Sequence, residues 1–419
     1  MGKGNEIKIA IPALRFPEFQ DTEGWKEYIL GDFLLEQPRY GINAPAVPFL
    51  EELPTYIRIT DISENGCFLP NPKVSVNHGA INDFYLNIGD LVFARTGASV
   101  GKCYKYKEKD GKLVFAGFLI KVSPDQTRLS SDFLFQFTFT QQYWKWIDLT
   151  STRSGQPGIN SKELASMELY LPVKDEQQKI ADCLSSLDDL IEATAQKVRA
   201  LEKHKKGLMQ QLFPAEGKNV PDLRFPEFQG TSVWDEKKLG KIGNFIGGGT
   251  PNTTNPEYWD GEILWYTPTE IKNGYLKSSN RKITKQGLKN SSAKLLPKGA
   301  ILITTRATIG DVAISKKECT TNQGFQSLVV NDSEINLFWF YWIIQHKEEL
   351  IKKASGSTFK EIGKNEIINI IAYSAKKQEQ QKIADCLSSI DELIEATTRK
   401  IEVLKEHKKG LMQQLFPKI

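Results

Sequence analysis

The 419-residue sequence is poor in the residues that most often carry catalysis or bind metals. Its four histidines are scattered, and none of its five cysteines forms a C-x-x-C pair. It contains no Walker A string and no H-E-x-x-H string, the usual motifs of phosphate-loop nucleotide hydrolysis and of zinc proteases. No P-D-x(n)-E-x-K nuclease core stands out either. The sequence therefore predicts no catalytic site and no metal site in this chain.

Membrane and export signals are also lacking. No apolar run reaches the roughly 18 residues that a membrane-spanning helix needs, and residues 1–10 are polar and contain glycine. An odd, unclustered set of cysteines is typical of a reducing compartment. We therefore expect a cytoplasmic protein. Its net charge of +4 permits nucleic-acid binding without demonstrating it.

Two strings imitate an adenine methyltransferase. Residues 245–249 read F-I-G-G-G, which fits the turn that passes S-adenosylmethionine in a doubly wound sheet. Residues 255–258 read N-P-E-Y and resemble an N-P-P-Y loop, but their glutamate would place an anion beside the target base. The two strings are also too close for a strand, a helix and a strand to separate them. A glycine turn and a proline turn in one loop explain them better.

The dominant feature is an internal repeat. Residues 176–214 recur at 379–417, and 30 of the 39 positions are identical. Neither copy contains a proline before its last residue, and apolar side chains recur at alternating steps of four and three, which is typical of a coiled coil. The central seam positions are Leu187, Ile191, Thr194, Val198 and Leu201 in the first copy, and Ile390, Ile394, Thr397, Ile401 and Leu404 in the second.

Charges along the two copies predict that they pair in antiparallel fashion. The first half of each copy is acidic on one side, and the later half is basic. An antiparallel pair sets Asp188 near Lys408 and Asp391 near Lys205, whereas a parallel pair sets like charges together. Exposed ion pairs are individually worth only about 0.2–1 kcal/mol, but here they agree on one orientation.

A second repeat opens each half of the chain. The string P-A-L-R-F-P-E-F-Q at 12–20 recurs as P-D-L-R-F-P-E-F-Q at 221–229, and Trp25 matches Trp234. Each half is thus an opening segment, a globular body and a long helix. We predict domains at 1–174 and 215–377, with the helices at 175–214 and 378–419.

The two bodies show the same order of signals with mostly different residues. A β run (56–62 or 263–267) leads to an Asn-Gly turn and then to a buried strand followed by a polar loop (89–102 or 299–311). One further β run covers 114–122 or 325–330. We predict helix for the aromatic segment 132–146, because its counterpart at 335–354 is too long for one strand. A glycine loop, a short helix and a last strand follow.

Polar loop residues at matching places in the two bodies are the candidates for reading DNA, since Arg, Asn, Gln, Ser and Thr contact base edges and phosphates. Each taken singly is better explained as an ordinary turn residue, and for Arg95 and Arg306 bonds to loop carbonyls are an equally good explanation. As a paired set they favour readout. The candidates are Arg95, Thr96, Ser99, Lys102, Arg153, Ser154 and Gln156 in the first body, and Tyr266, Thr267, Thr269, Asn273, Arg306, Thr308, Asn322, Gln323, Thr358 and Lys360 in the second.

With these motifs in place, the chain resembles the DNA-specificity (S) subunits of type I restriction-modification systems. The resemblance lies in the repeated K-K-G-L-M-Q-Q-L-F-P ending, the L-R-F-P-E-F opening, G-D-L-V-F-A-R-T-G-A-S-V-G-K and R-S-G-Q-P-G-I-N in the first body, and N-Q-G-F-Q-S-L and A-S-G-S-T-F-K-E-I in the second. Pro38-Arg-Tyr-Gly in the first body stands where the second has Gly248-Gly-Thr-Pro, so we expect the two bodies to read different half-sites.

The resemblance implies an α+β fold with two pseudo-repeated, mixed α/β target-recognition domains, separated by two long antiparallel helices that form a coiled coil. It implies a non-catalytic subunit that binds a bipartite, asymmetric double-stranded DNA sequence. The implied partners are two methyltransferase (M) subunits, which bind S-adenosylmethionine and methylate adenine at N6, and restriction (R) subunits. This chain would hold no cofactor, and the helix length would set the spacing of half-sites.

Two other interpretations stay open at this point. One is a stand-alone DNA adenine methyltransferase, which the lack of an N-P-P-Y pocket disfavours. The other is a coiled-coil linker with carbohydrate- or protein-binding bodies, which predicts no salt-dependent DNA affinity.

Overall fold

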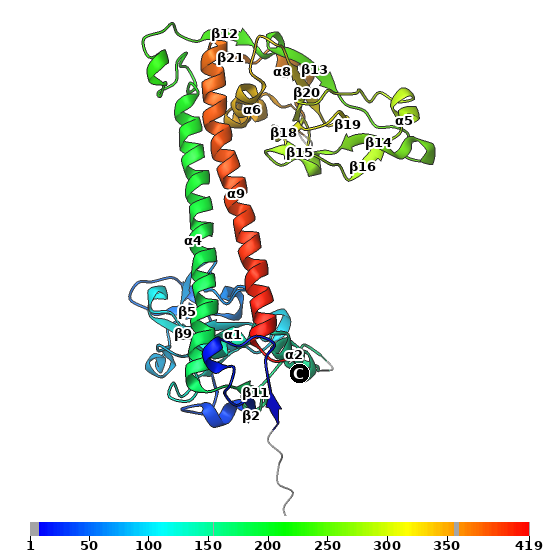
Figure 1. The fold of residues 1–419 in the computed structure, drawn as a ribbon. Coiled ribbons are helices and arrows are strands. Elements are labelled where there is room, and N and C mark those ends of the chain that lie inside the picture. The colour runs from blue at the N-terminus through cyan, green and yellow to red at the C-terminus, as the bar shows by residue number, and fades with distance from the viewer. Residues whose placement is uncertain (1–7, 154, 356–359, 419) are drawn as a thin grey trace, which may run out of the picture. The chain divides into compact units, whose positions relative to one another are not determined.

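The computed structural model describes residues 8–153, 155–355 and 360–418 (Figure 1). The chain divides into two compact units, unit 1 (Met1–Ala195 with Arg399–Ile419) and unit 2 (Gln196–Thr398). Two long helices, α4 (Lys174–Leu212) and α9 (Lys377–Leu415), each contribute one half to either unit. Within the described ranges, no helix is both long enough and apolar enough to cross a membrane.

The body of unit 1 contains three sheets. Strand β2 (Trp25–Ile29) lies between β1 (Ile9–Ala10) and β11 (Glu168–Leu171). The second sheet has the order β3 (Arg39–Tyr40), β10 (Leu119–Val122), β7 (Leu91–Ala94) and β8 (Cys103–Lys105). The outer sheet has the order β4 (Val47–Pro48), β6 (Val74–Ser75), β5 (Thr55–Ile57) and β9 (Leu113–Phe115). Its helices are α1 (Ser131–Phe137), α2 (Gln141–Ser151) and α3 (Ser161–Ala165).

The body of unit 2 repeats this plan. Strand β12 (Asp235–Lys238) pairs with β21 (Ile371–Ser374). The central sheet has the order β13 (Gly243–Gly247), β20 (Gln326–Val330), β17 (Ile301–Ile303), β18 (Val312–Ser315) and β15 (Tyr275–Leu276). The outer sheet has the order β16 (Arg281–Ile283), β14 (Trp259–Tyr266) and β19 (Cys319–Thr321). Its helices are α5 (Lys285–Lys289), α6 (Asn336–Gln345), α7 (Lys347–Lys353) and α8 (Lys364–Ile368).

The aromatic segments are helical, as predicted, and form α1 with α2 in unit 1 and α6 with α7 in unit 2. The single β run predicted over 114–122 is wrong. The chain turns at Gly117, whose N–H donates to Ile42 O at 2.7 Å, so that β9 and β10 belong to different sheets. The run predicted over 56–62 ends early at Ile57, because the Asp61 carboxylate accepts from the Arg58 N–H at 2.9 Å and starts a tight turn.

Within each unit the two helix segments run antiparallel, as the charges predicted. In unit 1, Lys408 Nζ donates to Asp188 Oδ2 at 2.6 Å, and in unit 2, Lys205 Nζ donates to Asp391 Oδ1 at 2.6 Å. All ten predicted seam positions are buried or half-buried. The Thr194 and Thr397 hydroxyls each donate to the carbonyl four residues earlier in their own helix at 2.6 Å, which satisfies a polar group inside the seam.

The repeated opening segment is an anchor for the helices. Its Arg15 guanidinium donates to both carboxylate oxygens of Glu176, at 2.9 and 2.5 Å, and both side chains are almost fully buried. The Leu14 N–H donates to Gln414 O at 2.9 Å, which ties the same segment to the end of α9. In unit 2, Arg224 binds Glu379 in the same two-pronged way, at 2.8 and 2.6 Å.

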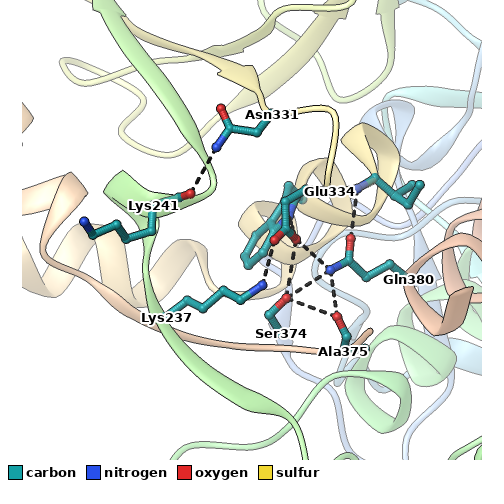
Figure 2. Close-up of polar contacts among 9 residues, drawn as sticks. Lys237, Lys241, Asn331, Glu334, Ser374, Ala375 and Gln380 are labelled. Carbon is teal, nitrogen blue, oxygen red and sulfur yellow. Dashed lines mark hydrogen bonds and ion pairs between the residues drawn. The ribbon is translucent and has the colours of Figure 1, made fainter. Parts of the chain in front are cut away.

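A buried glutamine next to each anchor holds the aromatic helix. Figure 2 shows Gln380 of α9, whose Oε1 accepts from the Ile335 N–H at 2.9 Å just before α6. Its Nε2 donates to Glu334 at 2.7 Å and to Ala375 O at 2.8 Å. In unit 1 the corresponding Gln177 accepts from the Ser130 N–H at 2.9 Å. Each long helix is thus bonded to its own body, which explains why this part of the repeat is so nearly identical.

Candidate nucleic-acid interface

Three segments that are distant in sequence meet at one edge of unit 1. Strand β7 ends at Ala94, and the next residue, Arg95, donates its N–H to Phe118 O at 3.0 Å. The Arg95 carbonyl accepts from the Ile159 N–H at 2.9 Å, and the Gly97 N–H donates to Pro157 O at 3.0 Å. The predicted polar loop and the predicted glycine loop therefore form one surface, next to the turn between β9 and β10.

Unit 2 builds the same junction. The Thr305 N–H donates to Gly324 O at 2.8 Å, and the Thr305 carbonyl accepts from the Ile362 N–H at 3.2 Å. Thr305 therefore occupies the place of Arg95. Arg306, which forms a β-bridge with Glu361, matches Thr96, which forms one with Gly158.

The expected pairing of Arg95 with Arg306 is therefore wrong by one residue. Equivalent bonds join Ala94 to Gly101 and Thr304 to Gly310, and the arginine is the first residue after Ala94 in the first loop but the second residue after Thr304 in the second.

Arg95 lies flat on an aromatic ring at this junction. Its guanidinium carbon is 4.4 Å from the centre of the Tyr40 ring, and one terminal nitrogen donates to Gly117 O at 3.5 Å. The Arg95 Nε is buried without a partner in the described part of the chain. Tyr40 is held in turn by the Ser161 N–H, which donates to its hydroxyl at 3.0 Å. The side chain is thus oriented while several of its donors stay available.

Two other predicted cations of unit 1 are already paired. Arg153 donates to Thr150 O at 2.8 Å and to Glu163 at 2.5 Å, so it joins the end of α2 to α3. Lys102 forms an ion pair with Glu64 at 2.6 Å. Both side chains have structural partners, which the sequence could not show because the carboxylates come from other segments.

The uncharged candidates of unit 1 differ in exposure. Thr96 and Ser99 are half-buried, and Gln156 is exposed. The Gln156 amide nitrogen lies 2.8 Å from the place where a Cβ at Gly97 would stand. Gly97 has φ +68°, a left-handed conformation that favours glycine. Ser154 lies outside the described residues.

In unit 2, Tyr266 is a core residue and not a surface residue. Its side chain is fully buried, and its hydroxyl has no hydrogen-bond partner among the described residues. Burial, with the nearby Cys319, raises the pKa of Tyr266 to about 12, so the phenol stays protonated. Its prediction as a DNA contact is wrong for this conformation, because β14 pairs with β19 and carries its side chain inward.

The neighbouring threonine of unit 2 also has a local structural role. Thr267 and Glu270 form a capping box, in which the Thr267 N–H donates to the Glu270 carboxylate at 2.8 Å. Thr269 is exposed, with its hydroxyl 3.1 Å from that of Thr267. Asn273 is exposed on the turn before β15.

Asn322 and Gln323 lie in the turn between β19 and β20. The Asn322 side chain accepts from the Gly324 N–H at 2.9 Å, and the Asn322 N–H donates to Tyr266 O at 3.0 Å. Gln323 is exposed, and its Oε1 accepts from the Thr250 hydroxyl at 2.6 Å.

Arg306 is exposed but paired. Its Nε lies 2.8 Å from the Glu361 carboxylate. The next residue, Ala307, has φ +60°, at the place where unit 1 has Gly97. Thr308 and Lys360 are exposed, and Thr358 lies outside the described residues.

Sequence reasoning missed Tyr40, Phe118 and Thr250. Tyr40 supports Arg95, Phe118 is 57% exposed at the junction, and Thr250 bonds Gln323. A signal for two of them was present, since Tyr40 and Thr250 lie in the strings Pro38-Arg-Tyr-Gly and Gly248-Gly-Thr-Pro that distinguish the two bodies. Unit 1 also has a cavity of about 350 Å³ beside Gly117 and Phe118. Among the residues described, no group of three or more potential metal ligands occurs.

Comparison with known proteins gives a consistent answer. The type I restriction modification DNA specificity domain matches residues 49–203 and 231–406. The chain is 37% identical over 201 residues to the MjaIX specificity subunit, a type I restriction enzyme subunit of Methanocaldococcus jannaschii, and this match covers 45% of the chain and 46% of that protein. It is 27% identical over 347 residues to the putative MjaX specificity subunit of the same organism, with 80% and 79% covered.

Two solved structures have the same fold. The S subunit of the type I restriction-modification system from M. genitalium has a TM-score of 0.61 at 16% identity, and the match covers 98% of this chain and 100% of that one. A chain from a study of complex assembly and conformational transition of the type I R-M system has a TM-score of 0.58 at 17% identity, with 96% and 98% covered.

Proposed function

Because the chain belongs to the type I restriction modification DNA specificity family, we propose that it is the non-catalytic subunit that reads a bipartite, asymmetric DNA sequence. Each unit reads one half of that sequence. DNA enters at the junction of the strand-end loops, where Arg95 and Gln156 lie in unit 1, and Gln323 and Arg306 in unit 2. These side chains are the types that form paired hydrogen bonds with guanine and adenine in the major groove.

One observation carries this proposal. Two backbone bonds and one β-bridge of this junction recur in both units, yet the side chains at the two matched positions differ. Arg95 corresponds to Thr305, and Thr96 to Arg306. A duplicated frame with diverged polar side chains suits two readers that dock alike and recognise different bases.

The chemistry belongs to partners in this proposal. Two methyltransferase subunits bind S-adenosylmethionine and methylate adenine at N6 within the recognised sequence, and restriction subunits join the same complex. The exposed faces of α4 and α9 dock the methyltransferases. The repeated exposed leucines Leu190 and Leu393, each 42% exposed, support two equivalent docking positions.

The test compares genomes of the host with and without this gene by single-molecule mapping of N6-methyladenine. We expect one bipartite motif to lose methylation when the gene is absent. Two variants, Gln156→Ala in unit 1 and Gln323→Ala in unit 2, assign the halves. Each should relax the base preference in one half of the motif only, by the roughly 1–3 kcal/mol that a bidentate contact contributes to discrimination.

A methylation pattern that does not depend on the gene would refute the proposal. Loss of base preference in both halves from either variant would refute the assignment of one half to each unit. Binding of S-adenosylmethionine by the isolated chain would instead support a stand-alone methyltransferase.

A further inference from the structure

The segments that contain most of the outer sheet in each unit carry opposite net charge. Residues 248–298, which include β14, β16 and α5, hold eight basic and four acidic side chains. Residues 41–90, which include β4, β5 and β6, hold two basic and six acidic side chains. The net charges of these two segments are therefore +4 and −4, although the segments occupy equivalent places.

The equivalence follows from strand register. In unit 1, β5 pairs in parallel with β9 and antiparallel with β6, and in unit 2, β14 pairs in parallel with β19 and antiparallel with β16. The cross-strand pair Thr55–Ser75 of unit 1 therefore occupies the same place as the cross-strand pair Leu264–Lys282 of unit 2. Val74, which is 8% exposed, therefore corresponds to Arg281, which is exposed.

The Arg281 side chain stacks on an aromatic ring and is exposed. Its guanidinium carbon lies 3.5 Å from the centre of the Trp259 ring and 5.8 Å from that of Trp265. The two indoles pack edge to face with centroids 5.0 Å apart, which makes a rigid platform. Throughout the described ranges the Arg281 guanidinium has no hydrogen-bond acceptor and no carboxylate partner. A stacked arginine with free donors is oriented to grip an anion in two-pronged geometry.

Three lysines adjoin this arginine in sequence and are exposed. They are Lys282 of β16 and Lys285 and Lys289 of α5. Within the ranges that the structure describes, none has a carboxylate within ion-pair distance. Some lysines elsewhere in unit 2 do find partners, such as Lys347 with Asp311 at 2.6 Å. Arg281 and these three lysines therefore form a short basic stretch of β16 and α5 that has no carboxylate partner among the described residues.

We propose that the outer sheet and α5 of unit 2 bind DNA phosphates, with Arg281 as the fixed contact and the three lysines around it, while the outer sheet of unit 1 makes no such contact. The inference rests on the proposed function and adds to it a sequence-independent grip supplied by one unit only. Phosphates fit better than base edges, because lysines act as flexible point charges without a fixed hydrogen-bond pattern. The acidic segment 41–90 of unit 1 repels the same backbone.

Counterion release makes the proposal measurable. Each phosphate contact contributes about 0.9 to the slope of log affinity against log salt concentration. The variant K282Q/K285Q/K289Q should therefore lower the slope by about 2.7. When the salt concentration rises from 50 to 200 mM, the DNA affinity of the unchanged protein should fall by a factor about 40 times larger than the factor for the triple variant. Arg281→Ala should lower the slope by about 0.9.

The experiment uses the full-length chain with its methyltransferase, and fluorescence anisotropy with the methylated motif and with a scrambled duplex. Lys73→Gln is the matched control, because Lys73 precedes β6 as Asn280 precedes β16 and lies 4.1 Å from the centre of the Phe49 ring. We expect the triple variant to lower the slope on both duplexes and the control to leave it unchanged. Unchanged hydrogen exchange of β14 identifies variants that keep the fold.

The outcomes separate the two proposals. If the unchanged complex binds no DNA, the proposed function fails and this inference fails with it. If the unchanged complex binds with a steep salt slope and the triple variant has the same slope, only the phosphate grip is refuted. If the triple variant no longer binds the methyltransferase but keeps the same salt slope, this surface is a protein interface, and the phosphate grip is refuted as well.

Discussion

Loss of Arg15 is expected to destabilise unit 1 more than most single substitutions, although Arg15 lies in the opening segment, outside the globular body. In the folded protein Arg15 is 8% exposed, and its guanidinium binds the carboxylate of Glu176, a residue that is 1% exposed. The Glu176 carboxylate raises the pKa of Arg15, as expected for a close pair. Arg15→Leu would leave Glu176 buried with one side-chain donor, the Trp25 indole N–H at 3.3 Å.

The magnitude follows from the burial of the orphaned charge. Removal of one partner of a buried ion pair costs about 3–5 kcal/mol, because the remaining ion lacks both water and its counterion. Replacement of both partners by apolar residues is often neutral or stabilising. We therefore expect Arg15→Leu to lose about 3–5 kcal/mol and the double variant with Glu176→Leu to recover most of it.

Unit 2 supplies a control within the same molecule. Arg224→Leu leaves Glu379 buried in the same way, but there the indole N–H of Trp234 has no hydrogen-bond partner in the described part of the chain. The loss in unit 2 should be at least as large as in unit 1, because no tryptophan donor remains bonded to the carboxylate.

The assay is native-state hydrogen exchange in increasing urea, read by mass spectrometry. Peptides from 174–195 report on unit 1 and peptides from 377–398 on unit 2, so that each variant should weaken protection in its own unit. A loss of unfolding free energy below about 1 kcal/mol for Arg15→Leu would contradict this prediction, since that is the scale of an exposed ion pair. Simple additivity in the double variant would refute it as well.

Three further predictions concern residues with positive φ, one helix–helix ion pair and one buried histidine. Ala307→Gly should stabilise unit 2 by about 0.5–1 kcal/mol, and Gly97→Ala should destabilise unit 1 by about 1–2 kcal/mol, because both sites have positive φ; urea denaturation measures both. Lys408→Glu should cost about 1 kcal/mol of stability and Asp188→Lys should restore it, as a double-mutant cycle would show. Desolvation lowers the pKa of His346 below its ordinary 6.5, so protonation favours the unfolded state. Unit 2 should therefore lose stability as the pH falls from 7.5 to 5.5. The His346→Gln variant should lose less stability over the same pH range. A difference in stability between the unchanged protein and His346→Gln that does not vary with pH would contradict the role given to His346.

The long helices were the most predictable part of the fold. A repeat of 39 positions with a 3.5-residue period contains its own evidence for helix and seam, because both depend on neighbours three and four residues away. The opposed charges also predicted the antiparallel direction that the Asp188–Lys408 and Lys205–Asp391 pairs confirm. The opening repeat was visible, but its role was not, since Glu176 lies 161 residues from Arg15.

The site was predictable as loops but not as side chains. Loop positions follow from glycine, Asn-Gly turns and strand ends, which are local signals. Whether a polar side chain in a loop is available depends on partners brought from elsewhere, as Glu163 is to Arg153 and Glu361 is to Arg306. The distinguishing strings around Tyr40 and Thr250 marked the right places, although their role required the contacts with Arg95 and Gln323.

The duplication, the direction of the helices, the order of helices and loops in each body and membership of the family could be read from the sequence, because these depend on short-range periodicity and on strings of residues. The folded chain was needed to show which arginines are already paired, that Tyr266 is buried, that Thr305 and not Arg306 stands where Arg95 does, and that the exposed Arg281 lies on two indole rings. Those outcomes depend on strand register and on which distant group fills each hydrogen bond, and neither is encoded within a few residues of the position concerned.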